Sequence, residues 1–108
     1  MNFGLKNTSI DQIIKVFTKY PELEKVLIYG SRAKGNFKPG SDIDLTFIGD
    51  GLNQSILNKI EDDIDDLFLP YTFDLSILKH ISNDDFIAHV SRVGIVFYER
   101  GINAVSVK

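Results

Sequence analysis

Two aspartates, Asp42 and Asp44, are the residues whose spacing most directly indicates chemistry. They lie two apart in the alternating segment DIDLTFI, and residues i and i+2 of an extended strand share one face of a sheet. Carboxylates that close repel each other unless a cation lies between them. Magnesium prefers hard oxygen ligands and commonly binds one or two carboxylates together with substrate phosphates. The pair therefore predicts a magnesium site.

A third carboxylate, Asp74, lies inside the segment YTFDLSIL, where an aspartate is unfavourable for a strand. Polar and apolar residues alternate along this segment, so Asp74 shares one polar face with Thr72 and Ser76. Two strands that each carry a mid-strand aspartate suggest a shared function. We predict that Asp42, Asp44 and Asp74 are both metal ligands and catalytic residues.

Gly30 and Ser31 supply the features of a phosphate site. They follow the apolar segment KVLIY and open a turn-rich stretch, GSRAKGNFKPGS. Free N–H groups at the start of a helical segment bind anions, and a glycine lets a phosphate approach the backbone closely. With the aspartates, they predict a site for ATP or another nucleoside triphosphate and two Mg²⁺ ions. One ion would activate the attacking oxygen and the other would bridge the triphosphate.

Other polar residues near this loop have more than one interpretation. Arg32 and Lys34 flank it, and either steering of the triphosphate or ordinary surface charge accounts for them. Arg32 and Ser41 are counted with the nucleotide-binding residues, although Ser41 also suits the turn before Asp42. The two histidines, His80 and His89, are expected on the surface or on a helix face.

Two common nucleotide motifs are not matched. Gly30 to Gly35 has the glycine spacing of a P-loop, but Asn36 and Phe37 stand where lysine and serine or threonine are needed. The sequence has no G-x-G-x-x-G, so a dinucleotide fold is unsupported. It also has no cysteine, which excludes disulfides, thiolate zinc sites and cysteine nucleophiles.

The elements that must position these residues alternate along the chain. Apolar periodicity predicts a helix at 9–20, capped by Thr8 or Ser9, and turn residues separate the later segments. A short helical turn is expected after Gly30, and Ser82 is expected to cap the last helix. The remaining predicted elements are strands at 25–29, 42–48, 71–78 and 94–98, helices at 52–68 and 82–92, and a tail from Gly101.

This order predicts an α/β (α+β) fold in which a mixed sheet of about four strands has helices packed mainly on one face. The other face would stay open, with the aspartates on it. The chain has 108 residues, which fits a single domain over 1–108.

Charge and hydropathy narrow the partners and the compartment. The chain has 12 Lys plus Arg against 15 Asp plus Glu, a net charge of −3, and no basic cluster, so a nucleic-acid substrate is not expected. The N-terminus lacks the apolar run of a signal peptide, and no stretch has the length of a membrane span. These features predict a cytoplasmic protein.

The spacing Gly30-Ser31, ten residues, then Asp42-Ile43-Asp44 resembles the G-S-x₁₀-D-x-D signature of the minimal nucleotidyltransferases of the DNA polymerase β-like superfamily. The resemblance covers roughly residues 5 to 100, and FDLSIL is similar to the family's third-carboxylate strand. It implies the nucleotidyltransferase fold and Mg²⁺-dependent nucleotidyl transfer. Stand-alone members resemble one half of a two-gene toxin–antitoxin pair, so the family implies a HEPN-domain partner protein that is adenylylated by this antitoxin.

Three functions follow as alternatives. The first is transfer of a nucleotidyl group, AMP if the donor is ATP, to a partner protein within a hetero-oligomer. The second is a non-catalytic module that masks a partner by contact alone. The third is transfer to a small molecule such as an antibiotic, for which the chain is too short to build an acceptor pocket unless a homo-oligomer completes it.

An acidic run near the end of the 52–68 helix has two interpretations. Like charges four residues apart destabilise a helix, as do anions near its C-terminus. The run is either a solvated face or a docking surface for a basic partner. Its members are Glu61, Asp62, Asp63, Asp65 and Asp66.

Overall fold

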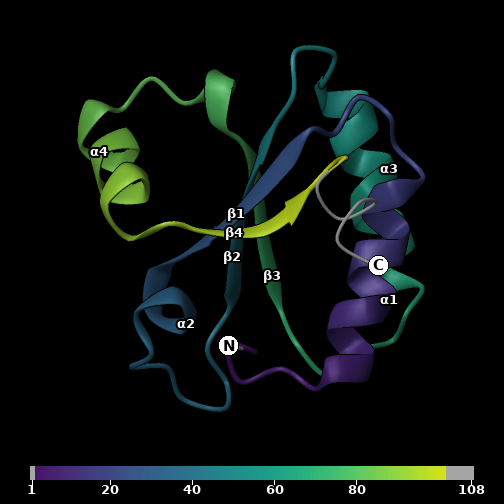
Figure 1. Cartoon of the computed structure of the whole chain (residues 1–108), viewed down its shortest axis with the longest axis vertical. Helices are drawn as coiled ribbons and strands as arrows, with labels where there is room; N and C mark the ends of the chain where they lie inside the picture. Colours follow the sequence, from purple (N-terminus) through teal and green to yellow (C-terminus); the bar gives the residue numbers. More distant parts are fainter. Residues whose placement is uncertain (1, 102–108) are drawn as a thin grey trace.

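A four-stranded mixed sheet forms the centre of the computed structural model, which describes residues 2–101 (Figure 1). The strand order is β3-β2-β1-β4. The elements in chain order are α1 (Asn7–Thr18), β1 (Lys25–Tyr29), α2 (Gly30–Lys34), β2 (Ile43–Ile48), α3 (Gln54–Asp65), β3 (Phe73–Ile77), the 3₁₀ turn η1 (Leu78–His80), α4 (Asp84–Val93) and β4 (Ile95–Glu99).

Strand directions confirm the predicted mixed sheet. β1 runs antiparallel to both β2 and β4, whereas β2 and β3 are parallel. A parallel pair needs a crossover connection, and α3 supplies it between β2 and β3. The parallel register places Asp44 opposite Asp74 and Thr46 opposite Ser76.

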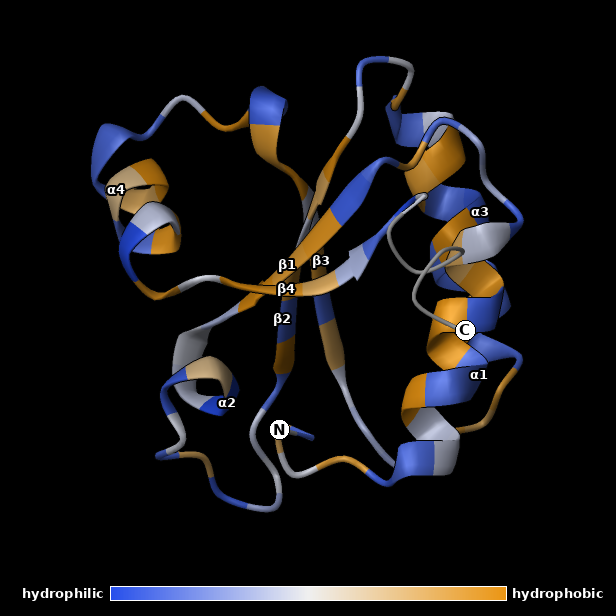
Figure 2. Cartoon of the chain, in the orientation of Figure 1, coloured by the Kyte–Doolittle hydropathy of each residue, from blue (hydrophilic) through white to orange (hydrophobic). Residues whose placement is uncertain are grey.

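The apolar core lies between the sheet and the two long helices, α1 and α3, to the right of the sheet in Figure 1. Figure 2 shows the hydrophobic sides of both helices turned toward the strands. Phe17 of α1 packs edge-on against Phe47 of β2, with ring centroids 5.5 Å apart. The predicted inward face of β2 is confirmed, because its members Ile43, Leu45 and Phe47 are all fully buried.

The opposite face of the sheet is partly covered, which refines the expectation of an open face. α4 lies on this side, to the left in Figure 1, away from α1 and α3. The ring of Phe86 in α4 meets the ring of Tyr29 in β1 at 5.2 Å. Thr46 is fully buried, while Asp74 is exposed. The polar face is therefore covered in part, and the carboxylates lie toward its uncovered end.

Helix ends differ from the sequence prediction by a few residues. α1 begins at Asn7, and its N-cap is Lys6, which makes no side-chain cap; neither Thr8 nor Ser9 caps it. Asn83 caps α4 by accepting a hydrogen bond from the N–H of Phe86 at 3.0 Å, so Ser82 is not the cap. Serine and asparagine are both common N-cap residues, so the sequence alone does not decide which of two neighbours caps the helix; the local backbone conformation does.

Two other predictions concern the end of α3 and the C-terminal tail. α3 ends at Asp65, short of the predicted end at Phe68, and the segment from Ile102, where the tail was expected, lies outside the described residues. Among residues 2–101, no helix is long and apolar enough to cross a membrane.

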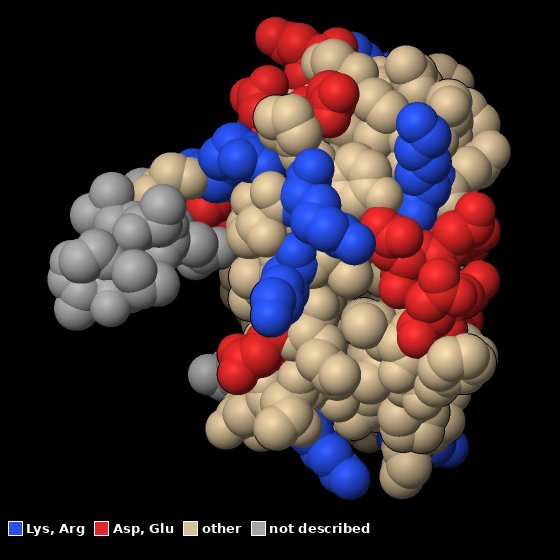
Figure 3. Space-filling view, turned by 90° about the vertical axis from the view of Figure 1, so that its right-hand side faces the viewer, with Lys and Arg blue, Asp and Glu red and all other residues tan. Residues whose placement is uncertain are grey.

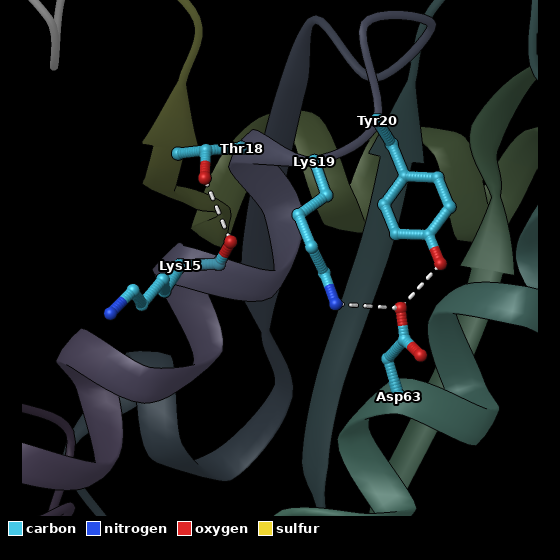
Figure 4. A network of polar contacts seen from close by, with 5 residues as sticks. All are labelled: Lys15, Thr18, Lys19, Tyr20 and Asp63. Carbon is cyan, nitrogen blue, oxygen red and sulfur yellow. Dashed lines mark hydrogen bonds and ion pairs between the residues drawn. The ribbon is translucent and has the colours of Figure 1, made fainter.

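A polar contact joins the two core-side helices (Figure 4). The Tyr20 hydroxyl, just after α1, donates to the Asp63 carboxylate of α3 at 2.5 Å, and Lys19 Nζ lies 3.3 Å from the same oxygen. Burial raises the pKa of Tyr20 to about 12, helped by this hydrogen bond and by the Asp63 charge. The hydrogen bond from Tyr20 in turn lowers the pKa of Asp63.

We expect Tyr20→Phe to lower the free energy of unfolding by about 1 kcal/mol at pH 7, because one hydrogen bond to a partly exposed carboxylate is lost. The lowered pKa of Asp63 means that its stabilisation is lost as the pH falls through that pKa. The raised pKa of Tyr20 means that its stabilisation is lost as the pH rises toward 12. Urea unfolding of the wild type, Tyr20→Phe, Asp63→Asn and Tyr20→Phe/Asp63→Asn between pH 2 and 12 measures both losses. If the destabilisation of the double variant equalled the sum of the two single effects, a direct bond between Tyr20 and Asp63 would be contradicted.

Candidate active site

Gly30 and Asp44 are in close contact, although they lie fourteen positions apart in the sequence. Gly30 begins α2 directly after β1, and its φ of +76° is a conformation that other residues rarely adopt. A Cβ placed on Gly30 would lie only 2.2 Å from Asp44 Oδ2. The glycine therefore provides both the turn and the space for the carboxylate. The structure brings the predicted phosphate turn and one predicted metal ligand together.

Asp44 and Asp74 are paired across the parallel strands β2 and β3, so their side chains leave the same face of the sheet. Asp44 is half-buried and Asp74 is exposed. Burial raises the pKa of the Asp44 carboxyl, and the negative charges of Asp74 and Asp42 raise it further. The two strands therefore hold carboxylates whose charges oppose one another.

Asp42 lies one residue before β2 begins and is exposed. Its carboxylate accepts a hydrogen bond from the hydroxyl of Thr72, the residue before β3. The main chains also meet here, since the N–H of Ile43 donates to the carbonyl of Thr72 at 2.8 Å. Asp42 is thus fixed at the same end of the sheet as Asp44, and Thr72 is a neighbour that the sequence analysis gave no role.

Tyr29 is a second residue that the sequence analysis missed. It pairs with Asp44 in the antiparallel register and is 7% exposed. Burial raises the pKa of its hydroxyl, and the charges of Asp74 and Asp44 raise it further, against a hydrogen bond with Ser76. Alternation along KVLIY, with Val26 and Ile28 in the core, was the available signal that Tyr29 faces the aspartates.

The histidines lie in different environments. His89 of α4 is partly buried, with its ring edge-on to Tyr29 at 6.4 Å between centroids. His80 is exposed, as expected.

Arg32 is not a surface residue, so the ordinary-surface-charge interpretation is wrong for it. It is 2% exposed, and its guanidinium donates to main-chain carbonyls, including that of Ser41 at 2.9 Å. Lys34 is exposed. The Ser41 hydroxyl accepts from the N–H of Lys38 at 2.9 Å, which is the turn-shaping contact that its position suggested.

The donor set fits a divalent cation. Among residues 2–101, no three Asp, Glu, His or Cys side chains form a group that could hold a metal ion by themselves. Magnesium usually takes only one or two carboxylates and completes its shell with phosphate and water oxygens. Asp42, Asp44 and Asp74 offer hard oxygens from adjacent strands, and their mutual repulsion would be relieved by a cation.

Two other features lie apart from this site. A cavity of about 370 Å³ between the far end of β2, η1 and α4 includes none of the predicted site residues. The acidic run lies on α3 and at its C-terminal end, on the core-side face of the sheet, and Figure 3 shows acidic patches and basic side chains (Lys or Arg) on this side of the molecule. Asp63 is engaged by Lys19 and Tyr20, whereas Glu61, Asp62, Asp65 and Asp66 are exposed. Their role as a docking surface stays a prediction.

Gly30→Ala should destabilise the protein by at least about 1 kcal/mol more than Gly35→Ala, because the new Cβ meets the Asp44 carboxylate. Gly35 is the matched control: its φ is +86° and a Cβ there would meet nothing within 4 Å, so it reports the backbone cost alone. Gly30→Ala/Asp44→Ala should recover most of the excess, since it removes the two nearest atoms, Asp44 Oδ2 and Cγ, and leaves Asp44 Cβ at an ordinary contact distance of 3.5 Å. Chemical denaturation measures all four proteins, and equal losses at Gly30 and Gly35 would contradict the contact.

Asp74→Asn should make the metal-free protein more stable at pH 7, by on the order of 0.5 kcal/mol after solvent screening. The folded-state pKa of Asp44 is raised, so its ionisation opposes folding and stability is lost as the pH rises through that pKa. Removing the Asp74 charge reduces this loss. Denaturation in EDTA across pH 3 to 8, with a carboxyl NMR titration of Asp44, tests it. Asp11→Asn on the exposed side of α1 is the control, and an unmoved Asp44 pKa in Asp74→Asn would refute the coupling.

Comparison with solved structures finds the same fold in toxin–antitoxin complexes. A toxin–antitoxin crystal structure with AMP-PNP is 20% identical, with a TM-score of 0.65 over 87% of this chain and 76% of that chain. The MNT antitoxin complex with tri-AMPylated Shewanella oneidensis HEPN toxin is 16% identical, with a TM-score of 0.61 over 93% and 77%. An MntA–HepT complex is 17% identical, with a TM-score of 0.60 over 91% and 76%. At these identities the likeness concerns the fold.

The sequence itself matches a protein family over most of its length. A comparison with curated proteins finds no match. The family described as polymerase beta, nucleotidyltransferase matches residues 11–103, a range that includes Gly30, Ser31 and all three aspartates. This chain therefore belongs to the polymerase β nucleotidyltransferase family.

Proposed function

We propose that this chain transfers AMP from ATP to a hydroxyl group of a HEPN-domain partner protein, in an Mg²⁺-dependent reaction that makes it an antitoxin. The observation that carries the proposal is the packing of the Gly30 turn directly against the carboxylate of Asp44, which is paired with Asp74. In the proposed reaction, this packing joins the turn that would bind phosphate to the acidic face that would bind metal. Family membership supports nucleotidyl transfer as the reaction class.

Each residue has a role in the proposed reaction. The Gly30 turn and the Ser31 hydroxyl would hold the triphosphate, while Asp42, Asp44 and Asp74 would hold the magnesium ions. Bound magnesium supplies charge neutralisation of the triphosphate and activation of the attacking oxygen. The acceptor oxygen bonds to the α-phosphorus, and the bond between that phosphorus and the pyrophosphate oxygen breaks. Asp74, which is more exposed than Asp44, accepts the hydroxyl proton. Positioning and electrostatics would supply most of the rate.

Three observations support a protein acceptor. The site is an acidic, partly uncovered sheet face on which Asp42 and Asp74 are exposed, and the net charge of −3 disfavours a nucleic acid. One fold neighbour is a complex whose HEPN toxin is tri-AMPylated. A cation-neutralised face open to one side suits a hydroxyl presented by a second protein.

Incubation of the chain with ATP labelled in the α-phosphate, Mg²⁺ and the product of the neighbouring gene tests the proposal. The wild type should label the partner, and Asp42→Asn/Asp44→Asn should reduce labelling by at least about 100-fold, because the carboxylates that hold the cation are gone. Asp11→Asn/Asp50→Asn is the matched control, since it removes two exposed charges, one on α1 and one in the turn after β2, away from both the site and the acidic run. It should label the partner normally.

The same experiment separates the alternatives. Full neutralisation of the partner by the Asp42→Asn/Asp44→Asn variant, without label, would favour a module that masks its partner by contact. Label that appears only on an added small molecule would favour a small-molecule nucleotidyltransferase. Either result would overturn the proposed function.

A further inference from the structure

Arg32 is the largest fully buried side chain of the protein among residues 2–101, and it carries a permanent charge. It lies directly after Ser31 in the short helix α2. Burying an ion is costly unless its donors are satisfied. Within the described residues, neither ion pair includes Arg32, so no carboxylate balances it there. Its surroundings must therefore explain why a charge is kept at this position.

Main-chain carbonyls take up the guanidinium donors. Nη1 donates to the carbonyl of Phe3 at 2.9 Å, and Nη2 donates to that of Pro39 at 3.3 Å. Ser41 receives two bonds on one oxygen, from Nε at 3.1 Å and from Nη2 at 2.9 Å. These carbonyls come from the N-terminal segment and from the loop that leads into β2.

Two aromatic rings flank the same guanidinium. The ring centroid of Phe37 is 5.1 Å from Cζ and that of Tyr71 is 5.6 Å away. Contact with aromatic faces is favourable for a guanidinium and stronger when water is excluded. Phe37 belongs to the loop after α2, and Tyr71 precedes β3. Arg32 therefore connects the segments that lead into both carboxylate-bearing strands.

The bidentate contact on Ser41 bears directly on the site. Ser41 immediately precedes Asp42, and Arg32 immediately follows Ser31, so one side chain spans the gap between the phosphate turn and the first aspartate. A planar fork with several donors holds one carbonyl in a defined direction, which a lysine ammonium does not. Because the side chain is 2% exposed, direct contact with a triphosphate would require the loop to open.

We propose that Arg32 is a positioning residue whose guanidinium fixes the Ser41 carbonyl, and with it the backbone of Asp42, relative to the Gly30–Ser31 turn. Its effect on metal binding and transfer rests on the proposed function, whereas its effect on the loop does not. Residues that orient metal ligands from outside the first coordination shell typically change metal affinity or activity 10- to 100-fold when they are replaced.

Arg32→Lys and Arg32→Met test the proposal, with Arg100→Met as the matched control. Within residues 2–101, the Arg100 guanidinium also donates to main-chain carbonyls, those of Leu23, Thr18 and Tyr20, but at the opposite end of β1 from Gly30. Amide hydrogen exchange of the ligand-free proteins reports the loop, in particular the Ser41 N–H that bonds to the Lys38 carbonyl. Binding of Mn²⁺ with a non-hydrolysable ATP analogue, and kcat and KM for transfer, report the site.

Arg32→Lys should speed exchange at Ser41 and Ile43, weaken Mn²⁺ binding by about 10-fold or more, and lower kcat more than it raises KM for ATP. Arg100→Met should lower the melting temperature but leave Mn²⁺ binding and loop exchange at wild-type values. If Arg32→Met does not fold, Arg32→Lys decides the result.

If the Ser41 N–H of the Arg32→Lys variant exchanged at the same rate as in the wild type, the proposal would be overturned. A lower melting temperature with unchanged Mn²⁺ affinity would also overturn it, because that would make Arg32 a stabilising residue only. If the wild type itself binds neither Mn²⁺ nor nucleotide, the proposed function fails. The exchange measurement then still decides whether Arg32 positions the loop.

Discussion

Repulsion between Asp44 and Asp74 is the constraint around which the functional face is built. The parallel register of β2 and β3 forces the two carboxylates side by side, and burial of Asp44 increases the cost of its charge. A fold under selection for stability alone would place threonine or valine at these positions. Keeping both aspartates makes sense when a cation and its phosphate ligands occupy the face. Gly30 belongs to the same constraint, because its missing side chain is the space that Asp44 Oδ2 fills.

The sequence allowed the two halves of this face to be predicted, because both depend on local rules. Alternation predicted which residues of β2 enter the core, and the Gly-Ser pair after an apolar strand indicated a turn. The contact between Gly30 and Asp44 and the pairing of Asp44 with Asp74 depend on strand order and register. Those are set by packing over the whole sheet, and a single sequence leaves them open.

Arg32 and Tyr29 show where local reasoning fails. An arginine next to a phosphate loop is normally assigned to the ligand, and nothing nearby in the sequence indicates that the carbonyls of Phe3 and Ser41 will surround it. Tyr29 was assigned to an apolar strand, although its place in the alternation puts its hydroxyl near the aspartates. α4 adds a further long-range effect, because it covers part of the face that its polar character had suggested would be open.

The two sides of the sheet divide stability from chemistry. On one side, α1 and α3 bury a continuous apolar cluster, and the Tyr20–Asp63 contact joins the helices at its edge. That burial is large enough to tolerate unfavourable charges on the other side, since each carboxylate costs little compared with a core of this size. The division also explains the loop between α2 and β2. This loop has little apolar surface of its own to bury. The buried guanidinium of Arg32, which donates to the loop carbonyls, is therefore an effective way to hold it. The same bonds keep Asp42 at the edge of the face where Asp44 and Asp74 already lie.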